Sequence, residues 1–269
     1  MRKLALCILI LTSLFTLAAC SGAKQPIPAN QPVETESGAD ANSNQEQTGK
    51  SEELKKIQVM LDWYPNAVHA YLYQAIEAGY FAEEGLDVQI MFPANPTDPI
   101  NLAAASNITL GISYQPDVIM ARAKEIPIVS VATIVHSPLN YPMLMANSEI
   151  QSPKDFEGKV IGFPGIPLNE PIIKTMVEND GGDFSKVEMI DIGFELGASI
   201  ISGRVDAVVG TFINHEFPML EHQGHQVRYF DPVEYGVPAY SELVFVTSEE
   251  TLATQQEEIR AFWRAASKG

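Results

Sequence analysis

The stretch IQVMLDWYPNAVHAYLYQAIEAGYFAEEGLDVQIMF, residues 57–92, holds one complete strand-helix-strand unit. Residues 57–62 and 86–92 are rich in Val, Ile, Leu and Met, as buried strands are. Between them, the apolar side chains of residues 67–79 recur with the period of an α-helix, and Gly79 stands where a helix usually ends. This order predicts a parallel βαβ unit.

The same alternation continues along the chain and predicts an α/β fold. Amphipathic, helix-like segments lie between the predicted strands. We expect strands near residues 57–62, 86–92, 108–113, 127–134, 159–163, 187–192, 206–212, 226–230 and 243–247.

Two turn-rich segments, residues 137–142 and 235–238, bracket a compact block of strands and helices. They predict that residues 144–240 form a second lobe, inserted into a first lobe made of residues 56–143 and 241–269. The chain would cross between the lobes twice, which gives a two-lobed fold with a double hinge and a ligand cleft between the lobes. The alternative is one larger doubly wound sheet.

The N-terminal segment has the pattern of a lipoprotein leader. An apolar run of 14 residues, 4–17, is shorter than the roughly 20 residues of a membrane span. It ends in Leu17-Ala18-Ala19-Cys20, which looks like a lipobox. We expect residues 1–19 to be a signal peptide, Cys20 to carry lipid on the extracytoplasmic face of the cell membrane, and residues 20–55 to be a disordered tether. The alternative is an ordinary secretory signal with a chance cysteine.

Charge and cysteine content exclude several kinds of partner. The chain has 17 basic and 34 acidic residues and a formal net charge of −17. Such a surface repels nucleic acid, favours a soluble monomer and suits a small neutral or cationic ligand. The two cysteines are Cys7 and Cys20, so the sequence beyond the leader and lipobox offers no disulfide, no cysteine-ligated metal and no cysteine nucleophile.

Candidate ligand-binding residues follow the predicted strands of the first lobe, where α/β sheets usually bind ligands. Trp63 offers a flat apolar face, Asn66 can donate and accept hydrogen bonds, and His69 lies one helical turn farther on. Tyr114 ends the third strand. This set suits a planar heteroaromatic ligand. The alternative is that Trp63 is a core residue, Asn66 only caps a helix and Tyr114 only precedes one.

The second lobe repeats the arrangement. Gly165 lies in a glycine-proline loop that leads into a helix beginning at Asn169. Glu170 would repel phosphate there and favour an amino group or a protonated ring nitrogen. Glu195 and Asn214 follow two further strands. The alternatives are that Glu195 only complements a helix dipole and that Asn214 only caps a helix.

The catalytic and metal-binding candidates match known patterns poorly. The segment HEFPM, residues 215–219, begins like a zinc-protease motif but lacks the second histidine and contains a proline. His215, His222 and His225 fit no strong metal template, so a surface histidine group is the better interpretation. No Gly-x-Ser-x-Gly elbow occurs. We therefore expect neither enzyme activity, nor a metal, nor a cofactor.

Five short motifs follow one another along the chain: LDWYPNAVH (61–69), NPTDP (95–99), SYQPD (113–117), GIPLNEP (165–171) and GFELG (193–197). With them, most of residues 57–250 resembles the ThiY lipoproteins, the substrate-binding components of ABC importers for thiamine pyrimidine precursors. The resemblance implies a type II periplasmic-binding-protein fold, an ABC permease as partner, and an aminopyrimidine ligand of the formylaminopyrimidine or hydroxymethylpyrimidine type. It implies as ligand-binding residues Trp63, Asn66, His69, Tyr114, Asn169, Glu170 and Glu195.

Three other functions stay open. A fungal pyrimidine synthase shares this fold and makes the ring from its own histidine and pyridoxal phosphate, but it carries a cysteine-rich iron motif that is missing here. A binding protein for nitrate or a sulfonate would need Arg or Lys, which the candidate residues do not include. An adhesin or sensor lipoprotein would bind no small molecule.

The C-terminal helix departs from the pattern of the resembling family. Relatives usually continue with further helices, whereas this chain ends at Gly269, after a helix that contains Ile259, Phe262 and Trp263. We expect the apolar face of that helix to need a partner, and the sequence leaves open a truncated C-terminus and an under-packed first lobe.

Overall fold

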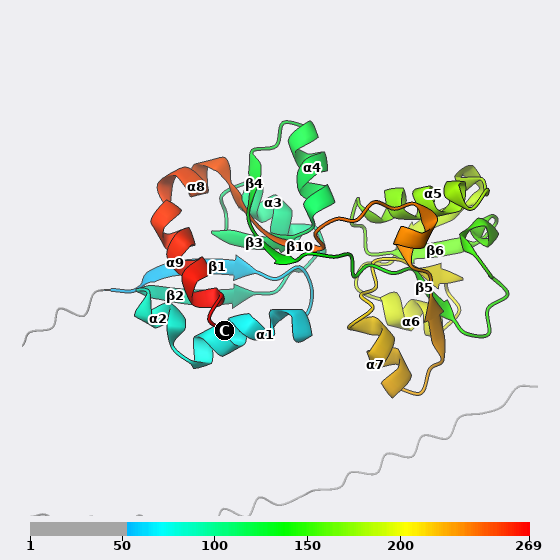
Figure 1. The fold of residues 1–269 in the computed structure, drawn as a ribbon, viewed down its shortest axis with the longest axis horizontal. Coiled ribbons are helices and arrows are strands. Elements are labelled where there is room, and N and C mark those ends of the chain that lie inside the picture. Colours follow the sequence, from blue (N-terminus) through cyan, green and yellow to red (C-terminus); the bar gives the residue numbers. More distant parts are fainter. Residues whose placement is uncertain (1–52) are drawn as a thin grey trace, which may run out of the picture. The chain divides into compact units, whose positions relative to one another are not determined.

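The computed structural model describes residues 53–269 (Figure 1). The predicted signal peptide and the predicted lipidation site, Cys20, lie outside the described residues, as does the predicted tether up to residue 52. Lys55, which we assigned to the end of the tether, already begins the first strand.

The first sheet consists of β1 (Lys55–Met60), β2 (Leu86–Met91), β3 (Leu110–Ser113), β4 (Ile128–Val135) and β10 (Leu243–Ser248). Its strand order is β2-β1-β3-β10-β4. Strand β1 pairs in parallel with β2 and β3, whereas β10 is antiparallel to β3 and β4. The predicted strands of this sheet are confirmed.

The second sheet consists of β5 (Met143–Met145), β6 (Val160–Phe163), β7 (Glu188–Asp191), β8 (Ala207–Val208) and β9 (Val227–Tyr229), in the order β7-β6-β8-β5-β9. Strand β5 was not predicted from the sequence. Strand β8 is shorter than the predicted strand 206–212, because Gly210 has a φ of +97° and turns the chain soon after Val208. Two separate sheets confirm the two-lobed α/β fold and contradict the single larger sheet.

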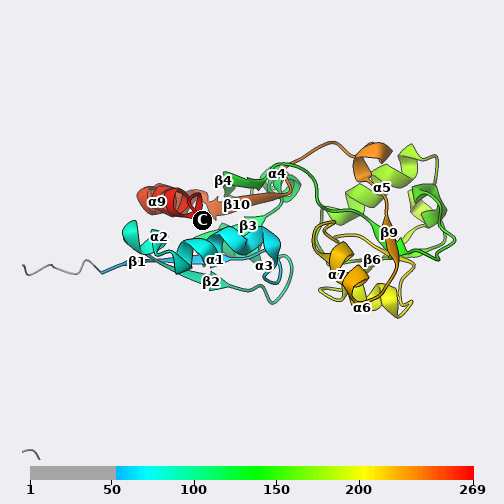
Figure 2. The ribbon, with the colours of Figure 1, turned by 60° about the horizontal axis from the view of Figure 1, so that its bottom comes forward.

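Helices cover both faces of the first sheet (Figures 1 and 2). One face packs against α1 (Ala70–Glu77), α2 (Tyr80–Glu83) and α9 (Gln256–Ala266), and the other against α3 (Asp98–Ala104) and α4 (Gln115–Ala123). Helix α8 (Glu249–Thr254) joins β10 to α9. The second lobe contains α5 (Asn169–Asn179), α6 (Leu196–Ile201) and α7 (Glu216–His222). Short 3-10 helices occupy η1 (Ala67–His69), η2 (Pro153–Phe156), η3 (Phe184–Lys186) and η4 (Pro232–Tyr235).

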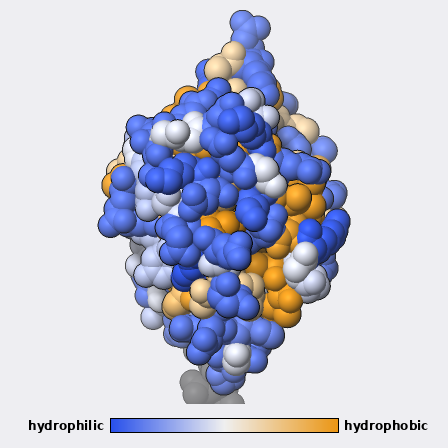
Figure 3. Space-filling view, turned by 90° about the vertical axis from the view of Figure 1, so that its right-hand side faces the viewer, coloured by the Kyte–Doolittle hydropathy of each residue, from blue (hydrophilic) through white to orange (hydrophobic). Residues whose placement is uncertain are grey.

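Large exposed apolar side chains come from both lobes of the described residues, and Ile119 and Phe92 are the most exposed of them. The face drawn in Figure 3 is mostly hydrophilic and has an apolar strip along one side. Within residues 53–269, no helix combines the length and the apolar character that crossing a bilayer requires.

Helix α9 finds its partners within the first lobe. Phe262 is 1% exposed and stacks on Phe81, with ring centroids 5.2 Å apart and an interplanar angle of 16°. It also meets Phe245 edge to face at 5.1 Å. The apolar face of α9 is therefore packed against α2 and β10, and the expected need for a partner is met by described residues.

We expect Phe262→Ala to lower the free energy of unfolding by about 3 to 5 kcal/mol, because it removes a buried ring from two aromatic contacts. Urea unfolding followed by circular dichroism measures this loss. Arg260→Ala, on the exposed side of the same helix, is the control and should cost less than about 0.5 kcal/mol. Equal losses in the two variants would contradict the packing role of Phe262.

The chain crosses between the sheets twice, through residues 136–142 and 230–242. Glu242, in the second crossing, is fully buried. Its Oε2 accepts hydrogen bonds from the backbone N–H groups of Leu139 (2.6 Å) and Asn140 (3.1 Å) in the first crossing. The double crossing is as predicted, while the exact lobe limits, 56–143, 144–240 and 241–269, stay a prediction.

Burial raises the pKa of the Glu242 carboxyl from its ordinary value of 4.5 to about 7. The folded state therefore binds this proton more tightly than the unfolded state does, so Glu242 lowers stability as the pH rises from about 4.5 to about 7. We expect Glu242→Gln, whose amide oxygen can still accept both N–H groups, to lose less unfolding free energy than the wild type between about pH 5 and about pH 8. Urea titrations at four pH values measure the two slopes, and identical slopes would contradict this account.

Candidate ligand-binding site

A small cavity lies between the two lobes. We call it the interlobe cavity. Its lining follows the ends of β1, β3 and β8, which are the edges where α/β sheets usually hold ligands. The lining residues are Asp62, Trp63, Asn66, Tyr114, Gly210, Phe212, His215 and Glu216.

Aromatic rings form much of the cavity wall. Trp63, Tyr114 and Phe212 are all buried. Trp63 meets Phe194 of the second lobe, with ring centroids 4.6 Å apart and an interplanar angle of 62°. Tyr64 contacts the same Phe194 ring at 4.9 Å. Burial, followed by the charge of the nearby Asp62, raises the pKa of Tyr114 well above its ordinary value, so its hydroxyl stays neutral. These rings suit a flat ligand.

A buried aspartate-histidine pair lies next to this wall. His69 Nε2 is 2.8 Å from Asp62 Oδ1, and the two side chains are 0% and 1% exposed. The turn after β1 brings them together, because Asn66 caps η1 in two ways. Its side-chain oxygen accepts the N–H of Val68 at 3.0 Å, and its backbone N–H donates to His69 Nδ1 at 3.2 Å. The pair is thus fixed by the local fold of the first motif.

A second acidic residue faces the cavity from the other lobe. Glu216 is 5% exposed, and its Oε2 accepts the backbone N–H of Phe212 at 2.6 Å. Burial raises the pKa of this carboxyl to about 7. His215 Nε2 lies 3.8 Å from Glu216 Oε1, and burial lowers the pKa of His215. The cavity therefore offers acceptors for N–H groups from both lobes.

The structure gathers some of the predicted ligand-binding residues and separates others. Trp63, Asn66 and Tyr114 line the interlobe cavity, and His69 contacts it through Asp62. The remaining predicted residues do not line it.

Gly165 lies in the loop before α5, and Asn169 is the first residue of that helix, next to the cavity residue Gly210. Asn169 is buried and accepts a hydrogen bond from Asn140 Nδ2 at 2.7 Å. Gly165 has a φ of +73°, and a Cβ there would meet Asp191 Oδ2 at 2.7 Å, so its role in this structure is to shape the loop.

Three predicted polar residues face solvent. Glu170 lies over a separate surface hollow with Lys174, and Glu195 and Asn214 are exposed and outside the cavity lining. In the GFELG motif it is Phe194, not Glu195, that reaches the first lobe.

Six residues that form the site were not predicted to bind ligand: Asp62, Phe194, Gly210, Phe212, His215 and Glu216. Asp62 and Phe194 lie within the motifs LDWYPNAVH and GFELG, directly beside Trp63 and Glu195. Their position at strand ends was a usable signal. Phe212 ends the predicted strand 206–212 and carried the same signal, whereas Glu216 lies in a segment that was considered only as a weak metal motif.

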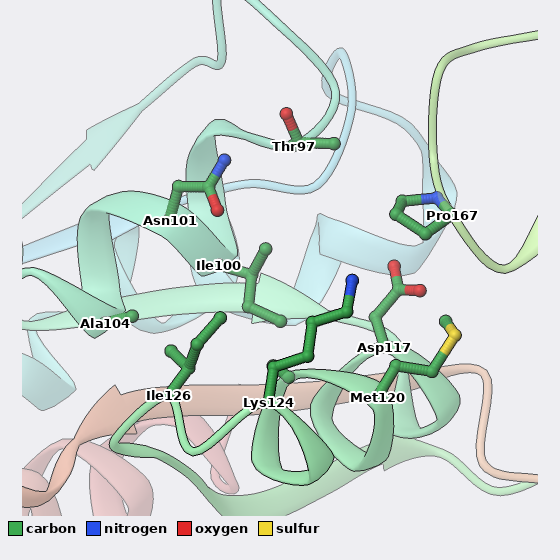
Figure 4. A pocket seen from close by; sticks show the side chains of 10 residues that line it. Thr97, Ile100, Asn101, Ala104, Asp117, Met120, Lys124, Ile126 and Pro167 are labelled. Atoms are coloured by element: carbon green, nitrogen blue, oxygen red, sulfur yellow. The ribbon is translucent and has the colours of Figure 1, made fainter.

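A larger cavity lies between α3 and α4 (Figure 4). Ile100, Met120 and Ile126 contribute to its walls. Figure 4 shows Asp117 and Lys124 directed toward the same part of it. Burial raises the pKa of Asp117 to about 7, partly offset by the backbone amide of Leu168. Because only one lining residue comes from the second lobe and no aromatic ring lines it, this cavity fits a flat ligand less well than the interlobe cavity.

The polar groups of the interlobe cavity do not favour an anion. Its lining includes two carboxylates but neither Lys nor Arg. Within the described range, 53–269, no group of three or more His, Cys, Asp or Glu residues is arranged to hold a metal ion.

Two relatives match most of this chain. The chain is 62% identical over 218 residues to the formylaminopyrimidine-binding protein of Halalkalibacterium halodurans, covering 81% of this chain and 66% of that protein. It is 27% identical to the 4-amino-5-hydroxymethyl-2-methylpyrimidine phosphate synthase of Legionella pneumophila, covering 80% of this chain and 68% of the synthase. The chain thus spans about two thirds of the length of each relative.

The likeness to a solved structure supports the fold alone. The alkanesulfonate-binding protein SsuA of Xanthomonas axonopodis pv. citri superimposes with a TM-score of 0.63 at 12% identity, covering 80% of this chain and 73% of that one. The model of the family described as NMT1/THI5 like matches residues 66–269. Since that match spans most of the chain, this protein belongs to the NMT1/THI5-like family.

Proposed function

We propose that this protein is the substrate-binding component of an ABC importer for a thiamine pyrimidine precursor, of the formylaminopyrimidine or hydroxymethylpyrimidine type. The interlobe cavity carries the proposal, because aromatic rings and acidic groups converge there from both lobes. The name of the relative at 62% identity supports the same ligand class. The protein acts as a monomer, and lipid on Cys20 tethers it to the extracytoplasmic face of the membrane.

The chemistry of an aminopyrimidine matches this lining. Its flat ring can lie against Trp63, and stacking of a ring on an aromatic side chain contributes about 1 to 3 kcal/mol in nucleobase sites. Its amino group can donate to a carboxylate, and Asn66 can pair with a ring nitrogen. The lining supplies both kinds of partner at once.

Closure of the lobes supplies the transport step. Asp62 and Trp63 come from the first lobe and Phe212 and Glu216 from the second, so a ligand between them contacts both. Such a ligand favours the closed arrangement, because only there does it make all of its contacts. The permease then recognises the closed protein and receives the ligand unchanged.

Two other activities fit less well. An iron-dependent pyrimidine synthase would need the cysteine-rich motif, whereas the cysteines of this chain are Cys7 and Cys20. A nitrate or sulfonate carrier would need cationic side chains at the cavity, and its lining has two carboxylates instead. We therefore propose binding without catalysis.

We expect Trp63→Ala to weaken binding of formylaminopyrimidine by about 10-fold or more, because it removes the main flat surface of the cavity. Isothermal titration calorimetry measures the dissociation constant. Trp263→Ala removes the only other tryptophan, which packs on Phe245 away from the cavity, and should leave the affinity within about twofold of the wild type.

The same pair of tryptophans provides an independent readout. In Trp263→Phe, Trp63 is the single tryptophan left, so any change in tryptophan fluorescence on adding ligand reports on the cavity. Unchanged affinity in Trp63→Ala together with no fluorescence change in Trp263→Phe would refute the proposed site.

We expect Cys20→Ala to move the protein from the membrane fraction to the soluble extracytoplasmic fraction, because each buried CH₂ of an attached chain contributes about 0.8 kcal/mol to membrane binding. Cell fractionation and immunoblotting measure the distribution. Cys7→Ala changes the only other cysteine and should keep the protein on the membrane. Membrane association of the Cys20→Ala protein after its leader has been cleaved would rule out the lipid anchor.

A further inference from the structure

A directed series of hydrogen bonds ends at the interlobe cavity. It starts at the backbone N–H of Asn66, which donates to His69 Nδ1 at 3.2 Å. Because an amide N–H can only donate, Nδ1 must be the unprotonated nitrogen of the ring. The proton of the neutral ring is then on Nε2, which donates to Asp62 Oδ1 at 2.8 Å. The backbone therefore sets the tautomer of His69 and the direction in which these hydrogen bonds are donated.

The last atom of this series of hydrogen bonds is Asp62 Oδ2. Asp62 is 1% exposed and lines the interlobe cavity, yet among the described residues its Oδ2 has no hydrogen-bond partner. A buried acceptor without a partner needs an explanation, because its desolvation is not compensated. An N–H donor on a bound ligand would compensate it.

The other cavity carboxylate differs from Asp62. Glu216 accepts the Phe212 N–H with Oε2, and its Oε1 faces His215 at 3.8 Å. The Oε1 distance is too long for a hydrogen bond, but that oxygen is not among the fully buried unpartnered atoms. Among residues 53–269, Asp62 Oδ2 is the carboxylate oxygen of the lining that is both fully buried and without a hydrogen-bond partner.

We propose that Asp62 selects a ring amino group over a ring oxo group at the same position, and that His69 is a positioning residue that decides which oxygen of Asp62 faces the ligand. The proposal rests on the proposed function, since it names the group that reads the pyrimidine. An amino group donates to Oδ2. An oxo group places a second acceptor against Oδ2 and leaves both without a proton.

The structure makes a sharp prediction for Asp62→Asn. The Nε2–H of His69 can be accepted only by the amide oxygen, so the amide NH₂ must take the place of Oδ2. A donor then faces the ligand where an acceptor stood. We expect the preference for the amino over the oxo compound to be about 10- to 100-fold in the wild type and to be lost or inverted in Asp62→Asn.

The experiment uses two probes, 4-amino-5-hydroxymethyl-2-methylpyrimidine and its 4-oxo counterpart, with calorimetry on each protein. Melting temperatures show that the variants are folded. Glu178→Gln, an exposed carboxylate-to-amide change on α5, is the matched control and should keep the wild-type preference.

Variants of His69 separate a positioning role from a structural one. His69→Gln retains a side-chain N–H that can reach Asp62, so we expect it to keep most of the amino preference. His69→Leu has no side-chain donor, so the Asp62 carboxylate is free to turn. The ratio of the affinities for the amino and the oxo compound should then fall toward one. In the double variant Asp62→Asn/His69→Leu the amide can face either way, and neither compound should be preferred.

Four outcomes would overturn the proposal. An amino preference below about twofold in the wild type would exclude selection by Asp62 without any variant. Asp62→Asn with the wild-type preference would remove Asp62 from the site while leaving pyrimidine binding, and so the proposed function, intact. His69→Leu with the wild-type preference would exclude the positioning role. A wild type that binds neither probe would refute the proposed function and this proposal together.

Discussion

A buried carboxylate holds the two crossing segments together. The interlobe cavity depends on this contact, because the two segments connect the lobes that form it. Glu242 in one crossing accepts two backbone N–H groups of the other, at Leu139 and Asn140. The side chain of Asn140 then continues into the second lobe, donating to Asn169 Oδ1 at 2.7 Å and accepting the Gly210 N–H at 2.8 Å. One set of hydrogen bonds therefore connects the hinge, the start of α5 and the cavity wall.

Most of the architecture could be predicted from hydrophobic patterning. The strands of the first sheet are long or fully buried, so runs such as residues 57–62 are legible in the sequence. The failures have local causes. Strand β5 is three residues long and follows a proline-rich crossing, and β8 is cut short by the positive φ of Gly210. No periodicity can be read from two or three residues.

The candidate site was less predictable than the fold. The sequence indicates where strands end, but it does not indicate in which direction the side chains after a strand point. Trp63, Asn66 and Tyr114 were expected at a ligand edge, and they line the cavity. Glu195 was expected for the same reason, but its neighbour Phe194 is the residue that crosses to the first lobe. Which of two adjacent side chains points inward depends on the turn after β7, a tertiary property that composition does not carry.

Gly210 lies where the cavity wall, the loop of Pro164 and the start of α5 meet, and this limits how the protein can evolve. A Cβ at this position would lie 2.7 Å from the ring of Pro164 and 3.4 Å from Asn169 Nδ2. Its φ of +97° also disfavours any other residue. A larger residue would displace the loop of Pro164, which carries the start of α5, and with it the contact to Asn140. Descendants of this chain can therefore retune the ligand through side chains such as Trp63, whereas the glycine, the proline and the two asparagines must change as a set or stay as they are.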